Sequence, residues 1–229
     1  MEEFKLKFYT NFIKDDRYMY LVTGLGNTLA ITFLAVMLGI VLGFLVAIIR
    51  STYDKTGKAK VLNMICKIYL TVIRGTPMMV QLMIMCYVVF GKYNVSKLIV
   101  TTLAFGINSG AYVAEIVRSG IMSIDEGQLE AGRSLGFSYV QTMRYIIMPQ
   151  AFKNVLPSLA NEFIVLLKET SVCGYIGMMD LTRGGDIIRS RTYEPFMPLI
   201  GVALIYLAMV MAFSALVGKL ERRLRTSER

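Results

Sequence analysis

The chain has 229 residues, of which 55% are apolar and only 18% are charged, and its formal net charge is +9. Soluble domains carry about a quarter charged residues, so this composition argues against a soluble globular class. The apolar residues are also clustered, because Thr28 to Ile49 is an uncharged run that is long enough to cross a ~30 Å hydrocarbon core. The basic residues lie in short segments between such runs, which is the positive-inside pattern of a membrane protein and not that of a nucleic-acid binder.

Five apolar stretches are long enough to cross a bilayer as helices. They lie at residues 20–49, 61–90, 98–117, 146–167 and 197–217. Residues 1–18 precede them and are polar, with phenylalanines four residues apart, which predicts an amphipathic segment on the membrane surface. The second stretch should kink or break at Arg74-Gly75-Thr76-Pro77, because proline lacks a backbone N–H. The pattern predicts an all-α integral membrane protein with five transmembrane helices in one domain, residues 1–229.

The distribution of basic residues predicts the orientation. Five spans place the two termini on opposite sides of the membrane. The basic turn at residues 50–60, the flanks of the loop at residues 118–147 and the C-terminal tail share one side only if the N-terminus is outside and the C-terminus is cytoplasmic. The tail carries Lys219, Arg222, Arg223 and Arg225.

Several kinds of chemistry are excluded by residues that the sequence lacks. With no histidine, the chain has no Ser-His-Asp triad, His-based zinc site or imidazole proton shuttle. It contains no G-x-x-x-x-G-K-[ST] phosphate loop, which excludes ATP hydrolysis by that route. Its three cysteines show no metal-ligand or redox spacing. We therefore expect a protein that is not an enzyme and that binds no cofactor or metal of its own.

The loop at residues 118–147 should contain a short cytoplasmic helix. Ser123 with Glu126, or Asp125 with Gln128, fits a capping box at its start, and Gly136 is a plausible stop. A charged and capped helix between two spans cannot lie in lipid. Taken alone, it could be an ordinary amphipathic connector.

The wider pattern around this helix resembles a known signature. Permease subunits of ABC importers carry E-A-A-x-x-x-G-x(9)-I-x-L-P, and this sequence matches its spacing with a glycine for the second alanine and a methionine for the leucine. The matching residues are Glu130-Ala131-Gly132, Gly136, Ile146 and Met148-Pro149. In that family the short helix docks into a cleft on the ATPase subunit and transmits its closing motion. The resemblance thus assigns coupling to Glu130, Ala131, Gly132, Gly136 and Pro149.

Further segments resemble the polar amino acid uptake branch of these permeases, which includes histidine, arginine, glutamine and cystine permeases. They are Arg74 to Pro77, Asn108 to Glu115 and Lys168 to Ser171. The resemblance implies the type I ABC importer permease fold in a bacterial plasma membrane. It also implies two ATP-binding subunits as partners, a second permease subunit (the same chain or a close paralogue) and an extracellular or periplasmic amino acid-binding protein. ATP would be bound by the partner subunit.

Polar residues within spans are costly and usually functional or paired. Asn108, Tyr112 and Glu115 recur at helical spacing on the third predicted span, and the fourth carries a second polar set. An amino acid needs an acceptor for its ammonium group and a donor for its carboxylate, and unwound backbone beside a break can line a cavity. The candidate substrate residues are Asn108, Tyr112, Glu162, Asn161, Lys168, Arg74 and Thr76. The alternative for each is a structural ion pair, an interhelical hydrogen bond or, at the break, a simple kink.

The carboxylate of Glu162 would favour a cationic substrate such as arginine, lysine or histidine. The second function considered is an ion-coupled secondary amino acid carrier, which would work without ATP. Five spans, a docking-type helix and the lack of an internal inverted repeat count against it.

Overall fold

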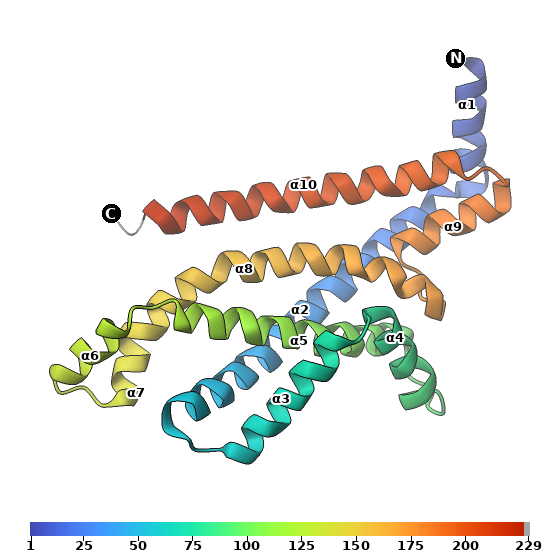
Figure 1. The fold of residues 1–229 in the computed structure, drawn as a ribbon. Helices are drawn as coiled ribbons and strands as arrows, with labels where there is room; N and C mark the ends of the chain where they lie inside the picture. Colours follow the sequence, from blue (N-terminus) through green and yellow to red (C-terminus); the bar gives the residue numbers. More distant parts are fainter. Residues whose placement is uncertain (227–229) are drawn as a thin grey trace. The chain divides into compact units, whose positions relative to one another are not determined.

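The computed structural model describes residues 1–226, which are almost entirely helical and contain no strand (Figure 1). The chain forms two compact units. Unit 1 comprises Met1–Val36, Pro77–Gly106 and Phe163–Ala215, and unit 2 comprises Met37–Thr76, Ile107–Glu162 and the chain from Leu216. The break predicted at residues 74–77 therefore lies at one boundary between the units.

The long helices follow the predicted order. Within residues 1–226, three helices are long and apolar enough to cross a membrane: α2 (Tyr18–Thr56), α5 (Lys97–Met122) and α10 (Phe196–Thr226). The pair formed by α3 (Lys60–Gly75) and α4 (Met78–Met83), which continues into a π-helical segment (Ile84–Val89), passes the same test as one broken span.

The fourth predicted span, residues 146–167, is the most polar. It corresponds to α8 (Met148–Glu169), which has 22 residues. Lys153, Asn154, Asn161 and Glu162 lie within it, and for this reason α8 is not among the helices that length and composition alone identify as spans. The identification of α8 as a membrane-spanning helix therefore depends on the fold and not on its composition.

The break in the second span is confirmed. Thr76 has an extended backbone with φ −122° and ψ 145°, and α4 begins directly after Pro77. A residue that precedes proline is driven out of the helical region by the proline ring. The sequence Gly-Thr-Pro therefore ends one helix and starts the next.

Unit 1 begins with α1 (Glu2–Phe8), followed by a π-helical turn (Tyr9–Ile13) and a 3-10 turn (Lys14–Asp16). Its apolar core includes Leu21 of α2, Leu181 and Ile188 of α9 (Leu181–Thr192), and Val202 of α10. The region between α8 and α10, expected as an outer loop, is thus mostly helical, because a 3-10 segment (Thr170–Ile176) also precedes α9.

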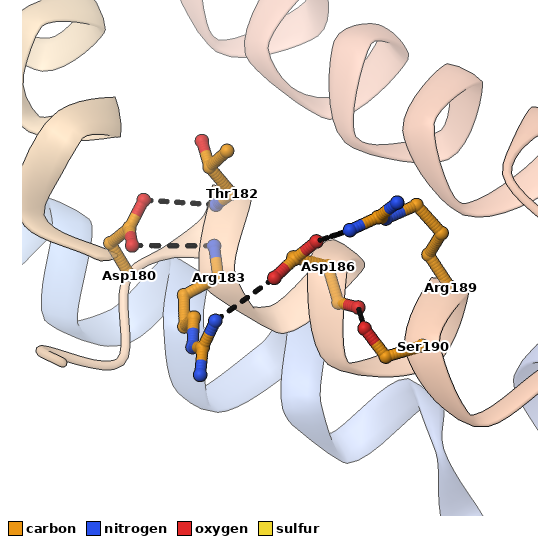
Figure 2. A network of polar contacts seen from close by, with 6 residues as sticks. All are labelled: Asp180, Thr182, Arg183, Asp186, Arg189 and Ser190. Carbon is orange, nitrogen blue, oxygen red and sulfur yellow. Dashed lines mark hydrogen bonds and ion pairs between the residues drawn. The ribbon is translucent and has the colours of Figure 1, made fainter. Parts of the chain in front are cut away.

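A buried aspartate starts α9. Asp180 accepts hydrogen bonds from the backbone N–H groups of Thr182 (3.0 Å) and Arg183 (3.3 Å), as Figure 2 shows. Along α9, Asp186 pairs with Arg183 (2.9 Å) and Arg189 (2.6 Å). The helix therefore carries its own cap and its own ion pairs, while its apolar side packs on α2.

Unit 2 contains the second half of α2, α3, most of α5 and the first part of α8. Small helices α6 (Glu126–Ser134) and α7 (Tyr139–Thr142) join α5 to α8 through a π-helical turn (Met143–Ile147) (Figure 1). Its core consists of Ala47, Val113, Val117, Ile121, Ile147, Ala151, Val155 and Leu159. A Cβ at Gly39 would lie 2.8 Å from Ser109 Oγ, so glycine permits α2 and α5 to pack closely in this unit.

Candidate functional site

A cavity of about 700 Å³ opens in unit 2. This volume falls within the roughly 300–1,000 Å³ typical of small-molecule sites. Most of the residues that line it are polar or charged, and they come from α3, α5, α8 and the end of α10. They include Arg74, Tyr112, Glu115, Ser119, Ser123, Lys153, Asn154, Ser158, Glu162 and Glu221.

Glu162 is the buried carboxylate of this cavity. It lies on α8 with 8% of its surface exposed, and it accepts a hydrogen bond of 2.9 Å from Ser109 Oγ of α5. A buried charge is tolerated only where hydrogen bonds or opposite charges stabilise it, and Ser109 supplies one such hydrogen bond. The carboxylate is therefore held in place between two helices at the cavity wall.

Arg74 and Tyr112 form a second feature of the cavity wall. The guanidinium carbon of Arg74 lies 5.5 Å from the ring centroid of Tyr112, which is a cation–π distance. Arg74 also faces Glu115, with 3.7 Å between Nη1 and Oε2. The cavity thus presents a carboxylate on α8 and a guanidinium held by an aromatic ring at the end of α3.

Three of the seven predicted substrate residues, Arg74, Tyr112 and Glu162, therefore line one cavity. Asn161 is exposed and lines a neighbouring hollow of about 510 Å³, also bordered by Glu162. Asn108 is buried in α5 with 3% of its surface exposed and is not among the lining residues.

Thr76 and Lys168 also lie outside the residues that line the cavity. Thr76 is exposed, and its hydroxyl donates to a carbonyl of the preceding helix (2.8 Å). Lys168 is exposed and belongs to unit 1. Two residues of the site were not predicted from the sequence: Ser109, which bonds to Glu162, and Lys153, which lines the cavity. Ser109 lies within the segment from Asn108 to Glu115 that had been singled out, directly after Asn108.

The short helix predicted within residues 118–147 is present as α6. Asp125 is its N-cap, and Oδ1 accepts from the backbone N–H of Gly127 (2.7 Å), so the second of the two predicted cap registers supplies the cap residue. Ser123 instead donates to Gly120 O (2.8 Å) and accepts from Asn154 (3.0 Å). A true capping box starts α7, where Ser138 and Gln141 bond reciprocally. The spacing Ser-x-x-Gln in the sequence was the signal for this box.

Gly136 ends α6 as predicted. Its φ is +87°, a region that residues with a side chain rarely adopt. Its N–H bonds to Arg133 O (3.0 Å), and the next N–H, from Phe137, bonds to Gly132 O (3.2 Å). This pair of bonds defines a Schellman motif, so the end of α6 is fixed.

Gly132 places α6 against α7. It is the buried glycine of α6, and a Cβ at this position would lie 2.5 Å from Thr142 Cγ2 and 3.0 Å from Ile146 Cδ1. Glu130 and Ala131, in contrast, are exposed on α6, and Pro149 is exposed in the first turn of α8, where its missing N–H costs little. Of the five residues predicted to take part in coupling, the two glycines shape α6 and its end, and the other three are exposed on the surface.

Comparison with known proteins decides the family. The model of the family described as "Binding-protein-dependent transport system inner membrane component" matches residues 39–226. The chain belongs to this family. Members are the membrane components of ABC importers, in which a separate subunit hydrolyses ATP. The chain is accordingly a multi-pass transport subunit of a bacterial membrane and not an enzyme, and the resemblance seen in its sequence is confirmed.

Curated relatives match over nearly their whole length. The putative glutamine transport system permease protein GlnP of Rickettsia typhi is 36% identical over 228 residues, which cover 98% of this chain and 99% of the relative. The arginine transport system permease protein ArtQ of Bacillus subtilis is 34% identical, with 91% and 94% covered. Glutamine permease GlnP of Escherichia coli K12 is 35% identical, with 90% and 93% covered.

Solved structures share the fold. The crystal structure of an amino acid ABC transporter with histidines has a chain that is 44% identical, with a TM-score of 0.83 over 90% of this chain and 94% of that one. The methionine transporter MetNI, in an inward-facing conformation, gives a TM-score of 0.76 at 21% identity, with 92% and 99% covered. The type I importer permease fold is therefore established for this chain.

Proposed function

We propose that this chain is the membrane-spanning subunit of an importer for polar amino acids and that it prefers cationic ones. The relatives support an amino acid cargo, since their names specify glutamine and arginine and a solved neighbour is described with histidines. The observation that carries the preference is the buried carboxylate of Glu162 at the wall of the 700 Å³ cavity.

The two ends of the cargo find opposite charges in this cavity. A cationic side chain or ammonium group pairs with Glu162, whose attraction is strengthened because burial lowers the local dielectric. The carboxylate of the amino acid binds Arg74, whose guanidinium presents several N–H donors and is oriented by the Tyr112 ring. Asn161, at the edge of the neighbouring hollow, is the next donor along α8.

Coupling to ATP hydrolysis is assigned to α6. The helix presents Glu130 and Ala131 at the surface, and a hollow of about 390 Å³ beside it contains Asp125, Glu126 and Glu130 among its lining residues. Three carboxylates suit a basic surface on an ATPase subunit. Gly132 and the turn at Gly136 fix the position of α6 relative to α7. A movement of the ATPase subunit that displaces α6 is therefore transmitted through α7 to the start of α8.

The assembly that follows has two ATP-binding subunits, a second permease subunit and an amino acid-binding protein outside the membrane. The α6–α7 segment then faces the cytoplasm, which places the N-terminus outside and the end of α10 inside. This orientation agrees with the concentration of basic residues in the α2–α3 turn and at the end of α10.

Replacement of Glu162 by glutamine tests the cargo preference. In proteoliposomes with the complete transporter, E162Q should reduce uptake of arginine and lysine at least about tenfold more than uptake of glutamine, since a charge-assisted bond becomes a neutral one. Glu221→Gln is the matched control, because it removes another carboxylate of the same cavity without affecting the Ser109 hydrogen bond. Equal losses for cationic and neutral amino acids in E162Q would refute the preference.

A further inference from the structure

A second hollow in unit 2, of about 460 Å³, has a different charge from the first. Its lining residues come from α2, α3 and α5, and they are Arg50, Lys67, Leu70, Thr71, Arg74, Gly75 and Glu115. Three of these side chains are cationic and one is anionic, so the lining carries a net charge of +2. It shares only Arg74 and Glu115 with the larger cavity.

The one carboxylate in this hollow is already engaged elsewhere. Glu115 Oε1 accepts from Arg118 at 2.8 Å (Nη2) and 3.2 Å (Nε), both within hydrogen-bond range. Its other oxygen, Oε2, lies 3.7 Å from Arg74 Nη1 and 3.9 Å from Arg50 Nη1. These two distances exceed the roughly 2.7–3.2 Å of a hydrogen bond, so Glu115 does not satisfy the donors of Arg50 and Arg74.

Arg50 contributes a buried hydrogen-bond donor to this hollow. Its side chain is 17% exposed, and its Nε is buried without a hydrogen-bond acceptor among the described residues. Buried guanidinium donors are normally paired, because leaving them unpaired costs desolvation energy. The arrangement of Arg50, Lys67 and Arg74 around one hollow thus provides donors for a ligand with several acceptor oxygens.

We propose that this hollow binds a phosphate group, supplied by the headgroup of an anionic phospholipid. A phosphate offers negative charge and multiple acceptor oxygens, which suits a guanidinium fork and a lysine ammonium group. Basic pockets between membrane helices at the cytoplasmic side are suited to such headgroups. In the orientation proposed above, Arg50 follows the apolar run that ends at Ile49 and therefore lies at the cytoplasmic boundary of the bilayer core.

The surface of α3 supports a lipid as the source of the phosphate. Met64, Ile68 and Val72 are 57%, 57% and 53% exposed, and their spacing of four residues places them on one side of the helix. By the same helical geometry, this apolar stripe lies beside the face that carries Lys67 and Thr71. A headgroup in the hollow therefore leaves an acyl chain next to an exposed apolar surface.

Native mass spectrometry of the delipidated transporter, with its ATPase subunits, tests the proposal. Phosphatidylglycerol should bind more tightly than phosphatidylcholine with the same acyl chains, and Lys67→Gln combined with Arg50→Gln should weaken its binding about tenfold or more. Lys60→Gln is the matched control, since Lys60 lies on the same helix outside the hollow, and it should leave binding unchanged.

Two further measurements distinguish a lipid headgroup from free phosphate and control for misfolded variants. If inorganic phosphate binds the wild type but not the double variant, and binds it more tightly than phosphatidylglycerol does, the phosphate site stands and the lipid as its source is overturned. K67Q alone, checked for intact assembly by size-exclusion chromatography, should give an intermediate loss. Equal binding of the two lipids, or equal effects of K67Q and K60Q, would refute the site.

Discussion

In unit 1, burial and hydrogen bonding act in opposite directions on the pKa of one carboxyl group, that of Asp180. Asp180 is fully buried and caps α9 (Figure 2). Burial raises the pKa of the Asp180 carboxyl, although the N–H groups of Thr182 and Arg183 oppose the shift. An acid with a raised pKa holds its proton more tightly in the folded state than in the unfolded state. Stability is therefore greatest below its ordinary pKa and falls as the pH rises through the raised value.

Asp180→Asn should remove this pH dependence. Asparagine keeps an acceptor oxygen for the cap but does not ionise, so the melting temperature of D180N should vary less between pH 4 and neutrality than that of the wild type. Circular dichroism of the purified transporter in detergent measures both. Asp180→Ala should also flatten the profile while losing roughly 1 kcal/mol from the missing cap. A slope as steep in D180N as in the wild type would contradict this account of Asp180.

At the scale of elements, the contact between α6 and α7 depends on one missing methyl group. The second alanine of the importer signature is glycine here, and a Cβ at Gly132 would lie 2.5 Å from Thr142 Cγ2. Thr142 is buried, and its hydroxyl donates to Ser138 O (3.1 Å), so it cannot easily move aside. The identity of residue 132 is therefore tied to that of residue 142.

Gly132→Ala should accordingly impair coupling, and Thr142→Ser should restore it. Serine keeps the hydroxyl that bonds to Ser138 and removes the methyl group that clashes. We expect G132A to lower substrate-stimulated ATP hydrolysis several-fold, since overpacking costs roughly 1–3 kcal/mol. The double variant G132A/T142S should recover most of the wild-type rate. If the double variant is as impaired as G132A, the contact with Thr142 is not the cause.

Elements whose causes are local were predictable. The cap at Asp125, the stop at Gly136 and the break before Pro77 each depend on residues within one turn of chain, and all three are present. The helix α9 was expected as part of a loop, although Asp180 with Leu181 and Ile188 carried the signals of a capped helix with one apolar side. Because most of its residues are polar, the apolar side formed by Leu181 and Ile188 was recognised only from its packing against α2.

The candidate sites were less predictable because distant parts of the chain form them. The pairing of Glu162 with Ser109 joins residues 53 positions apart. Glu115 meets Arg50 from α2 and Arg74 from α3, and no spacing in the sequence indicates that these charges converge. Sequence patterns identified polar residues within spans, but not which of them share a cavity.

At the scale of the whole molecule, one compact unit contains two of the proposed functional regions. Unit 2 contains both the cavity lined by Glu162 and the helix α6, so the proposed cargo site and the proposed contact with the ATPase belong to one compact unit. The chain has no phosphate loop of its own. In this family a separate subunit hydrolyses ATP, and under our proposal its motion reaches the membrane helices through α6.

Uptake of radiolabelled amino acids into proteoliposomes tests this claim most directly. With the ATPase subunits and the binding protein present, uptake should require ATP on the side of α6 and should stop when the ATPase cannot hydrolyse it. Uptake driven by a sodium or proton gradient without ATP would contradict the account and would favour an ion-coupled carrier.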